Sequence, residues 1–304
     1  MKRKPWSFLM RPATRAFVRE ARRTPGFTWF DGLHGYVYGR WPYLYIGIGT
    51  GEHPLARLLG PLVRWLSRLF PSKGSTIADT YHGKAVPLET ATQLVTVEEE
   101  IRLTDLENVI PYPYARDIVL QNPDHIVVLE CPCRASRPDP CLPLDVCLVI
   151  GEPFAGFVAE HHPRRSRWIT PDEAVEILRA EDERGHVHHA FFKDAMFGRF
   201  YAICNCCACC CGAMHAHRLG TPMLASSGYV CRVDADLCVG CGFCVDFCQF
   251  EALSVNDGWA AVDTDACMGC GVCISKCADG ALSLARDPAR PVPLEIRELV
   301  ASAR

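Results

Sequence analysis

Cysteine is the residue type that dominates the chemistry available to this chain. The 304-residue sequence holds nineteen cysteines, and all of them lie between Cys131 and Cys277. Closely spaced thiols either form disulfides or bind soft transition metals as thiolates. Disulfide-dense chains are typically short, whereas this chain is long enough to bury a core of its own. The odd number of cysteines and the adjacent run Cys209-Cys210-Cys211 favour metal thiolates.

Eight of the cysteines lie in an internal repeat with a period of 29 residues. Residues 233–255 align without gaps to residues 262–284, and 12 of the 23 positions are identical. Each copy carries the spacing C-x2-C-x2-C-x3-C. Three thiolates on one tight, glycine-containing loop can hold three corners of a cubane cluster. Two zinc sites with four cysteines each are the alternative, although such sites normally use paired C-x2-C arms.

The repeat, roughly 50 residues long, resembles the bacterial ferredoxins that carry two 4Fe–4S clusters. The resemblance implies two small hairpins and two short helices, one of each per copy. It also implies that the fourth cysteine of each copy completes the cluster of the other copy. Cluster one would be held by Cys238, Cys241, Cys244 and Cys277, and cluster two by Cys267, Cys270, Cys273 and Cys248. The residue after each fourth cysteine is usually Pro in that family, but here it is Gln249 and Ala278.

Ten further cysteines lie in two short segments near the middle of the chain. Residues 131–147 hold four of them and residues 204–211 hold six. Ten thiols are enough for two four-thiolate clusters, or for one cluster with structural cysteines beside it. Zinc and redox-active thiols are the alternatives. The ligands we expect for one cluster are Cys131, Cys133, Cys141 and Cys147, with further ligation by Cys204, Cys206, Cys207 and Cys210. Cys231 receives no assignment.

The order of features from Cys131 to Leu284 resembles a group of uncharacterised, multi-cysteine ferredoxin-like proteins of anaerobic bacteria and archaea. The shared order is CxCR, two further cysteines, a helix, a Gly-x-Val-His segment, CNCCxCCC and a two-cluster ferredoxin. This resemblance implies electron transfer through several clusters and names no substrate. The motif Cys210-Cys211-Gly212 resembles, more weakly, disulfide reductase subunits in which paired CCG motifs bind a non-cubane cluster. One such motif is present here.

Strands and helices must bring the two cysteine segments of the middle region into position. Residues 125–130 contain the apolar run Ile-Val-Val-Leu at 126–129 and predict a buried strand leading into the first segment, and residues 200–203 predict a strand leading into the second. We therefore expect the two segments to meet in space. Residues 113–121 predict a short helix stopped by Asn-Pro, and residues 170–185 predict a helix with a capping box at its start and Gly at its end.

The first 74 residues differ in charge and composition from the rest of the chain. They hold 13 Lys and Arg against three acidic residues, a local charge of +10 (13 − 3), and four of the six Trp. Leucines at helical spacing predict an amphipathic helix over residues 54–70, kinked at Pro61. Aromatic residues that alternate with Gly and Pro predict a loop or short strand over residues 36–51.

This basic, Trp-rich arm has the composition of a segment that binds a membrane interface, but it can equally pack on the protein or on a partner subunit. No recognised nucleic-acid module accompanies the charge, so we expect no nucleic-acid partner. The sequence contains no run of 18 apolar residues, so we predict no transmembrane helix. We also see no secretory signal. We expect a cytoplasmic protein in a reducing compartment, either soluble or attached through the arm to the cytoplasmic membrane face.

The sequence as a whole predicts an α+β chain in four parts. A basic, aromatic-rich arm (1–74) precedes a cysteine-rich α/β domain (75–230), a two-cluster ferredoxin module (231–286) and a C-terminal tail or helix (287–304). The expected cofactors are two 4Fe–4S clusters and one or two further iron–sulfur clusters. The expected function is relay of single electrons between redox protein partners. The alternative is a reductase subunit with a catalytic cluster in the middle domain.

Overall fold

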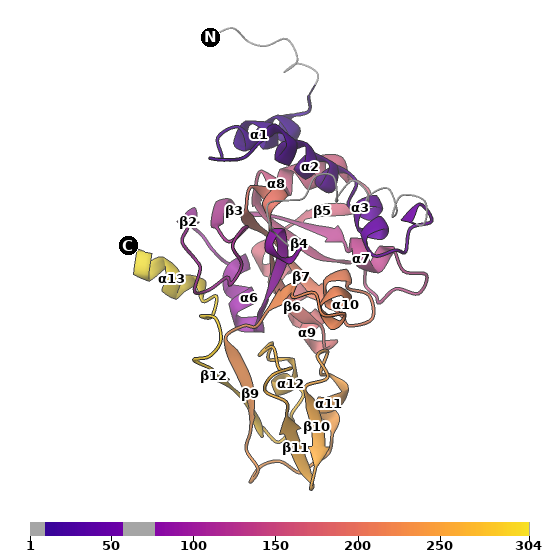
Figure 1. Cartoon of the computed structure of the whole chain (residues 1–304), viewed down its shortest axis with the longest axis vertical. Helices are drawn as coiled ribbons and strands as arrows, with labels where there is room; N and C mark the ends of the chain where they lie inside the picture. Colours follow the sequence, from indigo (N-terminus) through magenta and orange to yellow (C-terminus); the bar gives the residue numbers. More distant parts are fainter. Residues whose placement is uncertain (1–9, 57–76, 304) are drawn as a thin grey trace.

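A mainly antiparallel sheet of eight strands organises the middle of the chain in this computed structural model, which describes residues 10–56 and 77–303 (Figure 1). The order along the sheet is β2-β3-β4-β7-β6-β1-β8, and β5 pairs with β3 outside this path. The strands are β1 (Tyr81–Val86), β2 (Ile101–Leu103), β3 (Ile118–Glu130), β4 (Asp145–Glu152), β5 (Ser166–Ile169), β6 (Val187–Lys193), β7 (Arg199–Cys206) and β8 (Leu224–Ala225).

Helices cover the sheet and bury its central strands. Every residue of β6 is buried, as expected for a strand in the middle of a sheet with side chains packed on both faces. Helices α6 and α9 pack against each other and on β3 and β6, while α8 packs on β3, β4 and β5. The helices of this region are α5 (Ile77–Thr80), α6 (Leu88–Val95), α7 (Pro132–Ala135), α8 (Phe154–His161), α9 (Pro171–Glu183), the 3-10 helix η2 (Asp194–Met196) and α10 (Gly212–Arg218).

The strands predicted at residues 125–130 and 200–203 are confirmed as parts of β3 and β7. The helix predicted over residues 170–185 is confirmed as α9. The Thr170 hydroxyl accepts the Glu173 N–H at 3.2 Å at its start, and Gly185 takes a positive φ of 82° after its end. Because β3 and β7 both pair with β4, the two cysteine segments are carried to the same region of the sheet, as expected.

The helix predicted over residues 113–121 is wrong. Strand β3 begins at Ile118 and continues through Asn122 and Pro123. A register shift against β4 between Gln121 and Ile126 marks an irregularity there, and Asn122 adopts a positive φ of 46°. The Asn-Pro pair therefore interrupts the ladder as a bulge, which is one of the few places where a sheet accepts Pro.

The loop or short strand predicted over residues 36–51 is also wrong, since helices occupy this segment. They follow α1 (Pro12–Ala21) and are α2 (Trp29–Arg40) and α3 (Pro42–Gly49). A capping box between Thr28 and Asp31 starts α2. A Cβ at Gly39 would meet the Phe157 ring of α8, so this glycine permits close packing of two helices and does not mark a turn.

The described part of the basic arm packs on the α/β domain. Phe17 of α1 is 1% exposed and contacts the rings of Phe157 and Phe197. The Glu160 carboxylate of α8 accepts the backbone N–H groups of Ala13 and Thr14 at 2.8 and 3.0 Å at the start of α1. Most of the amphipathic helix predicted at 54–70 lies outside the described residues.

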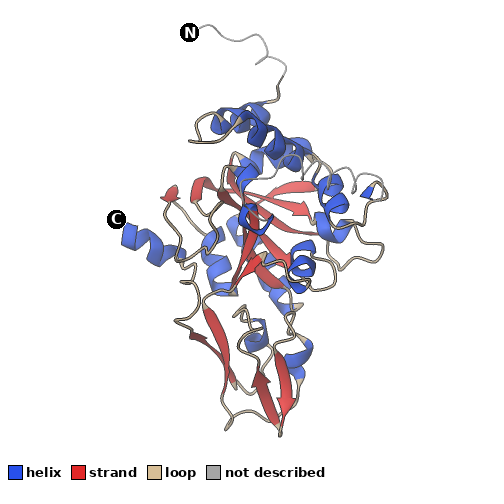
Figure 2. Ribbon diagram, in the orientation of Figure 1, coloured by secondary structure: helices blue, strands red, loops and turns tan. Residues whose placement is uncertain are grey.

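The C-terminal module consists of two short strand pairs and two single-turn helices (Figure 2). Strands β10 (Leu253–Asn256) and β11 (Trp259–Val262) form a hairpin that joins the two repeats. Strand β9 (Tyr229–Val233), at the start of the module, pairs with β12 (Leu282–Arg286) at its end. The resemblance implied one hairpin per copy, whereas here the second pair joins the two ends of the repeat. Helices α11 (Phe243–Asp246) and α12 (Val272–Ser275) follow the cysteine loops, one in each copy.

The chain returns to the α/β domain after the module. Helix α13 (Ile296–Ala303) packs on α6 and β2, and Leu294 and Ile296 are buried there. Within the described ranges, no helix is both long enough and apolar enough to cross a bilayer.

Candidate metal centres

The repeat in the C-terminal module places its eight cysteines around two cavities of about 20 Å³ each. One cavity is lined by Cys238, Cys241, Cys244 and Cys277, and the other by Cys248, Cys267, Cys270 and Cys273 together with Cys231. The structure thus brings together the two ligand sets that the resemblance implies, including the exchange of the fourth cysteine. Gly240, Gly242, Gly269 and Gly271, between the ligands of the two loops, have positive φ angles of 63–85°.

Backbone N–H groups point at the sulfur atoms of both sets. The fourth cysteine of each copy accepts the N–H of the residue four positions later: Cys248 from Ala252 at 3.2 Å, and Cys277 from Ala281 at 3.3 Å. Ala260 N–H donates to the Cys238 sulfur at 3.3 Å. Four thiols with amide donors around a small cavity fit an iron–sulfur cubane, whose negative charge such donors stabilise.

Cys231, which the sequence left unassigned, lies beside the second of these sets. Its backbone N–H donates to the Cys267 sulfur at 3.5 Å, and its own sulfur lies 3.7 Å from that of Cys273. The Cys231 side chain is buried. It is therefore an additional thiol at the edge of this four-cysteine set, delivered there by β9.

The ten cysteines of the middle region form a different grouping from the one expected. The sulfur atoms of Cys141, Cys207, Cys209 and Cys210 all lie within 4.8 Å of one another, and we call these residues the four-thiol group. The Cys141 and Cys209 sulfurs are 3.0 Å apart, and the Cys141 N–H points at the Cys210 sulfur at 3.5 Å. The structure therefore groups Cys141 with the second cysteine segment and not with Cys131.

Cys209 was absent from the expected ligands and is the exposed member of the four-thiol group. Burial acts to raise the pKa of its thiol, but hydrogen bonds from Cys141, Cys207 and Cys210 outweigh that effect, so the pKa is lowered. The thiolate is the form that binds a metal ion, so a lowered pKa at Cys209 favours ligation by this group. The run of six cysteines in eight residues was the signal for it, but the run did not show which sulfurs point the same way.

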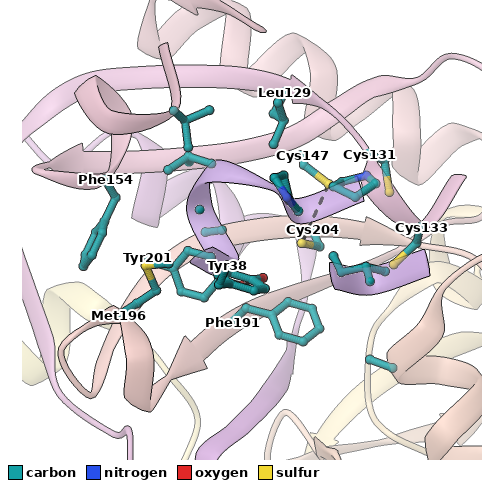
Figure 3. A pocket seen from close by; sticks show the side chains of 18 of the residues that line it. Tyr38, Leu129, Cys131, Cys133, Cys147, Phe154, Phe191, Met196, Tyr201 and Cys204 are labelled. Carbon is teal, nitrogen blue, oxygen red and sulfur yellow. Dashed lines mark hydrogen bonds between the residues drawn. The ribbon is translucent and has the colours of Figure 1, made fainter. Parts of the chain in front are cut away.

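The other six cysteines of the middle region, together with Cys207 of the four-thiol group, line a larger cavity of about 90 Å³ (Figure 3). Cys147 of β4 and Cys204 of β7 are direct register partners, and their sulfurs are 3.9 Å apart. The Cys206 and Cys211 sulfurs are 3.2 Å apart. The cysteines that line this cavity are Cys131, Cys133, Cys147, Cys204, Cys206, Cys207 and Cys211. Cys211, like Cys209, was not among the expected ligands.

Burial and hydrogen bonds between thiols favour the protonated form of Cys131 in this cavity. The hydrogen bond with Cys133 and burial raise the pKa of Cys131 to about 12, against the lowering effect of Cys147. Because a thiol must lose its proton to bind a metal, binding here would release protons.

Aromatic residues line the opposite end of the cavity. Figure 3 shows Phe154 and Met196 far from the cysteines, with Tyr38 and Tyr201 between them. The two tyrosine hydroxyls are 2.7 Å apart. Next to them the Lys193 ammonium lies 4.8 Å from the centre of the Tyr38 ring, and burial lowers the pKa of Lys193 to about 8. One end of the cavity thus offers thiols, and the other an apolar, aromatic surface.

Arg134, the residue that follows Cys133, fixes the geometry of this region. Its side chain is buried and pairs with the Glu181 carboxylate of α9 at 2.5 Å. The same guanidinium donates to the Asn205 carbonyl of β7 at 3.1 Å. Arg134 therefore ties the first cysteine segment to α9 and to the second segment. A buried charge of this kind is tolerated because it is paired and hydrogen-bonded.

The C-terminal module packs directly on the cysteine-rich domain. The Ser275 hydroxyl donates to the Asp182 carboxylate at 2.9 Å, and the Lys276 ammonium donates to the Glu183 carbonyl at 2.9 Å, both at the end of α9. Phe250, two residues after Cys248, makes a ring contact with His189 of β6. These contacts hold the module against the end of the sheet that carries the middle cysteines.

Comparison with known proteins identifies the chemistry of the module. The family model for a 4Fe-4S binding domain matches residues 232–254. A "Probable ferredoxin" of Methanosarcina thermophila is 57% identical over 28 residues, which are 9% of this chain and 48% of the relative. The chain therefore spans about half the length of the curated relative it matches. The C-terminal segment is an iron–sulfur module similar to ferredoxins, and it binds at least one 4Fe–4S cluster.

Proposed function

We propose that this chain is an electron-transfer protein with several iron–sulfur clusters, which relays single electrons between redox protein partners. The C-terminal module would hold two 4Fe–4S clusters, one on Cys238, Cys241, Cys244 and Cys277 and one on Cys248, Cys267, Cys270 and Cys273. When bound, each cluster takes up and gives back one electron. The role of the protein is to hold the thiols, to exclude water and to direct amide N–H groups at sulfur.

The observation that carries this proposal is the contact between the module and the four-thiol group. Ala208, which lies between two members of that group, is hydrogen-bonded to the module at 2.8 Å. We therefore propose that the four-thiol group and the thiol end of the larger cavity bind the further clusters. The two module cavities and these two sites would then hold the redox centres of the relay.

Iron counting on anaerobically purified protein tests this proposal. Since a 4Fe–4S cluster has four irons, we expect about twelve to sixteen irons per chain, in a brown protein that bleaches with dithionite. About eight irons, all lost on removal of the C-terminal cysteines, would contradict the additional clusters. A colourless protein that contains zinc would contradict the whole proposal.

A second candidate function is favoured by the shape of the larger cavity. Thiols at one end and an apolar, aromatic surface at the other would suit a reductase site, in which the thiols would hold a cluster and the aromatic end would bind a substrate. The chain would then be a reductase subunit that acts on a disulfide or a similar substrate. A new paramagnetic signal on addition of a thiol would support this function, and an unchanged spectrum would favour the relay.

The N-terminal helices provide a surface for a further partner. Trp29, Phe30 and Leu33 of α2 are exposed, and the arm is basic. We propose that this face attaches the protein to a partner subunit or to the cytoplasmic membrane surface. Deletion of the arm would remove the buried Phe17 and Tyr38, so the matched test is Trp29→Ser with Phe30→Ser. Loss of sedimentation with anionic liposomes in this variant would support attachment to the membrane through this face. Unchanged sedimentation would exclude this face as the membrane contact.

A further inference from the structure

Gln249 stands where ferredoxins of the type that the module resembles usually have Pro, directly after the candidate ligand Cys248. Its side-chain amide makes two hydrogen bonds. Nε2 donates to the Gly185 carbonyl at 3.0 Å, and Oε1 accepts the Ala208 N–H at 2.8 Å. Both partners belong to the cysteine-rich domain, so one side chain of the module is bonded to two backbone segments outside it.

One of the two backbone partners lies between candidate metal ligands, and the other lies at the contact between α9 and the module. Ala208 is the residue between Cys207 and Cys209, both members of the four-thiol group. Gly185 ends the turn after α9, and the Phe247 ring packs where a Cβ of Gly185 would lie. Gln249 therefore joins the backbone that carries one candidate ligand to the backbone that carries two others.

The second copy of the internal repeat has a different residue at the position equivalent to Gln249. Ala278 is the equivalent residue of the second copy, where it follows Cys277 and is exposed. Its methyl group has no donor and no acceptor. The two departures from Pro are therefore unlike each other: the residue at position 249 has a side chain that connects two domains, and the residue at position 278 does not.

We propose that Gln249 is a positioning residue that connects the cluster completed by Cys248 electronically to the metal centre of the four-thiol group. The proposal rests on the function proposed above and adds the route. The path runs along the covalent chain from Cys248 to Gln249 and across one hydrogen bond of 2.8 Å to the backbone between Cys207 and Cys209. One electron is lost on one side and gained on the other, and no bond forms or breaks.

The chemistry of glutamine explains why this residue fits the position. Its planar amide offers one acceptor and two donors, so it can serve a backbone N–H and a backbone carbonyl at once. Methionine has a similar length but can make neither bond well. Glutamate keeps the acceptor for Ala208 and loses the donor for Gly185. A comparison of Gln, Glu and Met at position 249 therefore distinguishes the effect of the hydrogen bond to Ala208 from the effect of side-chain packing.

The test compares Gln249→Met with Ala278→Met, which introduce the same residue at equivalent positions of the two repeats. The first readout is hydrogen exchange at the Ala208 amide, which does not depend on electron transfer. The second is the rate of electron transfer from the photoreduced module to the middle centre, followed by freeze-quench paramagnetic resonance. Iron content and melting temperature are measured on each variant.

We expect Gln249→Met to speed Ala208 exchange and to slow electron transfer by about tenfold or more, as loss of an outer-shell partner does at metal sites. Ala278→Met is expected to match the wild type in both. Gln249→Glu is expected to retain most of the rate, because it keeps an oxygen in position for the Ala208 N–H.

Full iron loading with an unchanged rate in Gln249→Met would overturn the role of Gln249 and leave the proposed function intact. If Gln249→Met loses iron, the comparison of Gln249→Glu with wild type decides, and a tenfold slower rate in that loaded variant would also overturn the assignment to Ala208. A wild-type protein with iron only in the module would overturn the proposed function, and the electron route with it.

Discussion

At the scale of single residues, the surroundings of Cys231 are unusual because its thiol lies against a candidate ligand without belonging to the ligand set. Cys273 must lose its proton to bind iron, so the Cys231 thiol is the available donor across their 3.7 Å contact. Hydrogen bonds to cluster sulfur stabilise the reduced, more negative form. Cys231→Ala should therefore lower the reduction potential of the cluster proposed on Cys248, Cys267, Cys270 and Cys273, as measured by redox titration.

The control for this prediction is Cys231→Ser, which keeps a donor at the same position. We expect its potential to lie near that of the wild type. The backbone N–H of residue 231 continues to donate to Cys267 in both variants, so the comparison isolates the side chain. Equal potentials in the alanine and serine variants, both below wild type, would show that sulfur itself is required and not its proton.

The buried Lys84 predicts how stability depends on pH. Lys84 lies in β1 and its ammonium donates to the Ser226 carbonyl at 3.0 Å. Burial, with a smaller effect of Arg286, lowers its pKa to about 7, whereas an unfolded lysine has a pKa of about 10.4. Between these values the unfolded chain binds more protons than the folded one, so the free energy of unfolding rises with pH.

Lys84→Met should remove this dependence while keeping most of the side-chain volume. We expect the variant to be more stable than the wild type near pH 7 and the difference to shrink as the pH approaches 9. Denaturant unfolding of both proteins at several pH values measures it. A constant difference across this range would contradict a neutral Lys84 in the folded protein.

At the scale of elements, the turn after α9 depends on Gly185. Its φ of 82° is unfavourable for other residues, and a Cβ would lie 2.5 Å from the Phe247 ring of the module. Gly185→Ala should destabilise the protein by about 1–3 kcal/mol through strain, and more through displacement of Phe247. The variant should also speed hydrogen exchange in the segment around residue 247.

Gly220→Ala is the matched control, because Gly220 has a φ of 87° and no atom within 4 Å of its Cβ position. The Gly220→Ala variant therefore has the same kind of backbone strain but no contact with the module. Similar free energies of unfolding and similar hydrogen exchange in the two variants would show that the packing of Phe247 does not depend on Gly185.

The sequence predicted those elements whose signals are local. The apolar run before Cys131 and the capping residues of α9 act within a few positions, so the second half of β3 (residues 125–130) and α9 were predicted correctly. Helix α2 was missed because Gly39 is needed for packing on Phe157, a residue more than a hundred positions away. The Asn-Pro pair of β3 was misread for the same reason, since a bulge depends on the partner strand.

At the scale of the whole molecule, the grouping of the middle cysteines is a property of the tertiary fold. The resemblance of the repeat to two-cluster ferredoxins implied two ligand sets, and each set lines one cavity. The middle cysteines do not share the spacing of the repeat. Cys141 leaves its neighbours in sequence and meets Cys209, 68 residues later, because the loop after α7 reaches the second segment.

This grouping predicts which substitutions have the same effect. Cys141→Ser and Cys209→Ser should each lower the iron content by about four atoms, the content of one 4Fe–4S cluster, and remove the same spectroscopic signal. Cys131→Ser should affect a different signal, that of the larger cavity. Iron analysis and paramagnetic resonance of the three variants measure this. A Cys141→Ser spectrum that matches Cys131→Ser would contradict the four-thiol group.

The C-terminal module is attached to the rest of the molecule at both of its ends. Strand β9 enters it from the α/β domain, β12 leaves it beside β9, and α13 then packs on α6 and β2. A carrier domain on a single linker can swing between an electron donor and an acceptor, but a module tethered twice has no such freedom. If the chain relays electrons as proposed, its partners would have to travel to it and dock, and we expect the rate of turnover to depend on partner concentration and not on a domain motion.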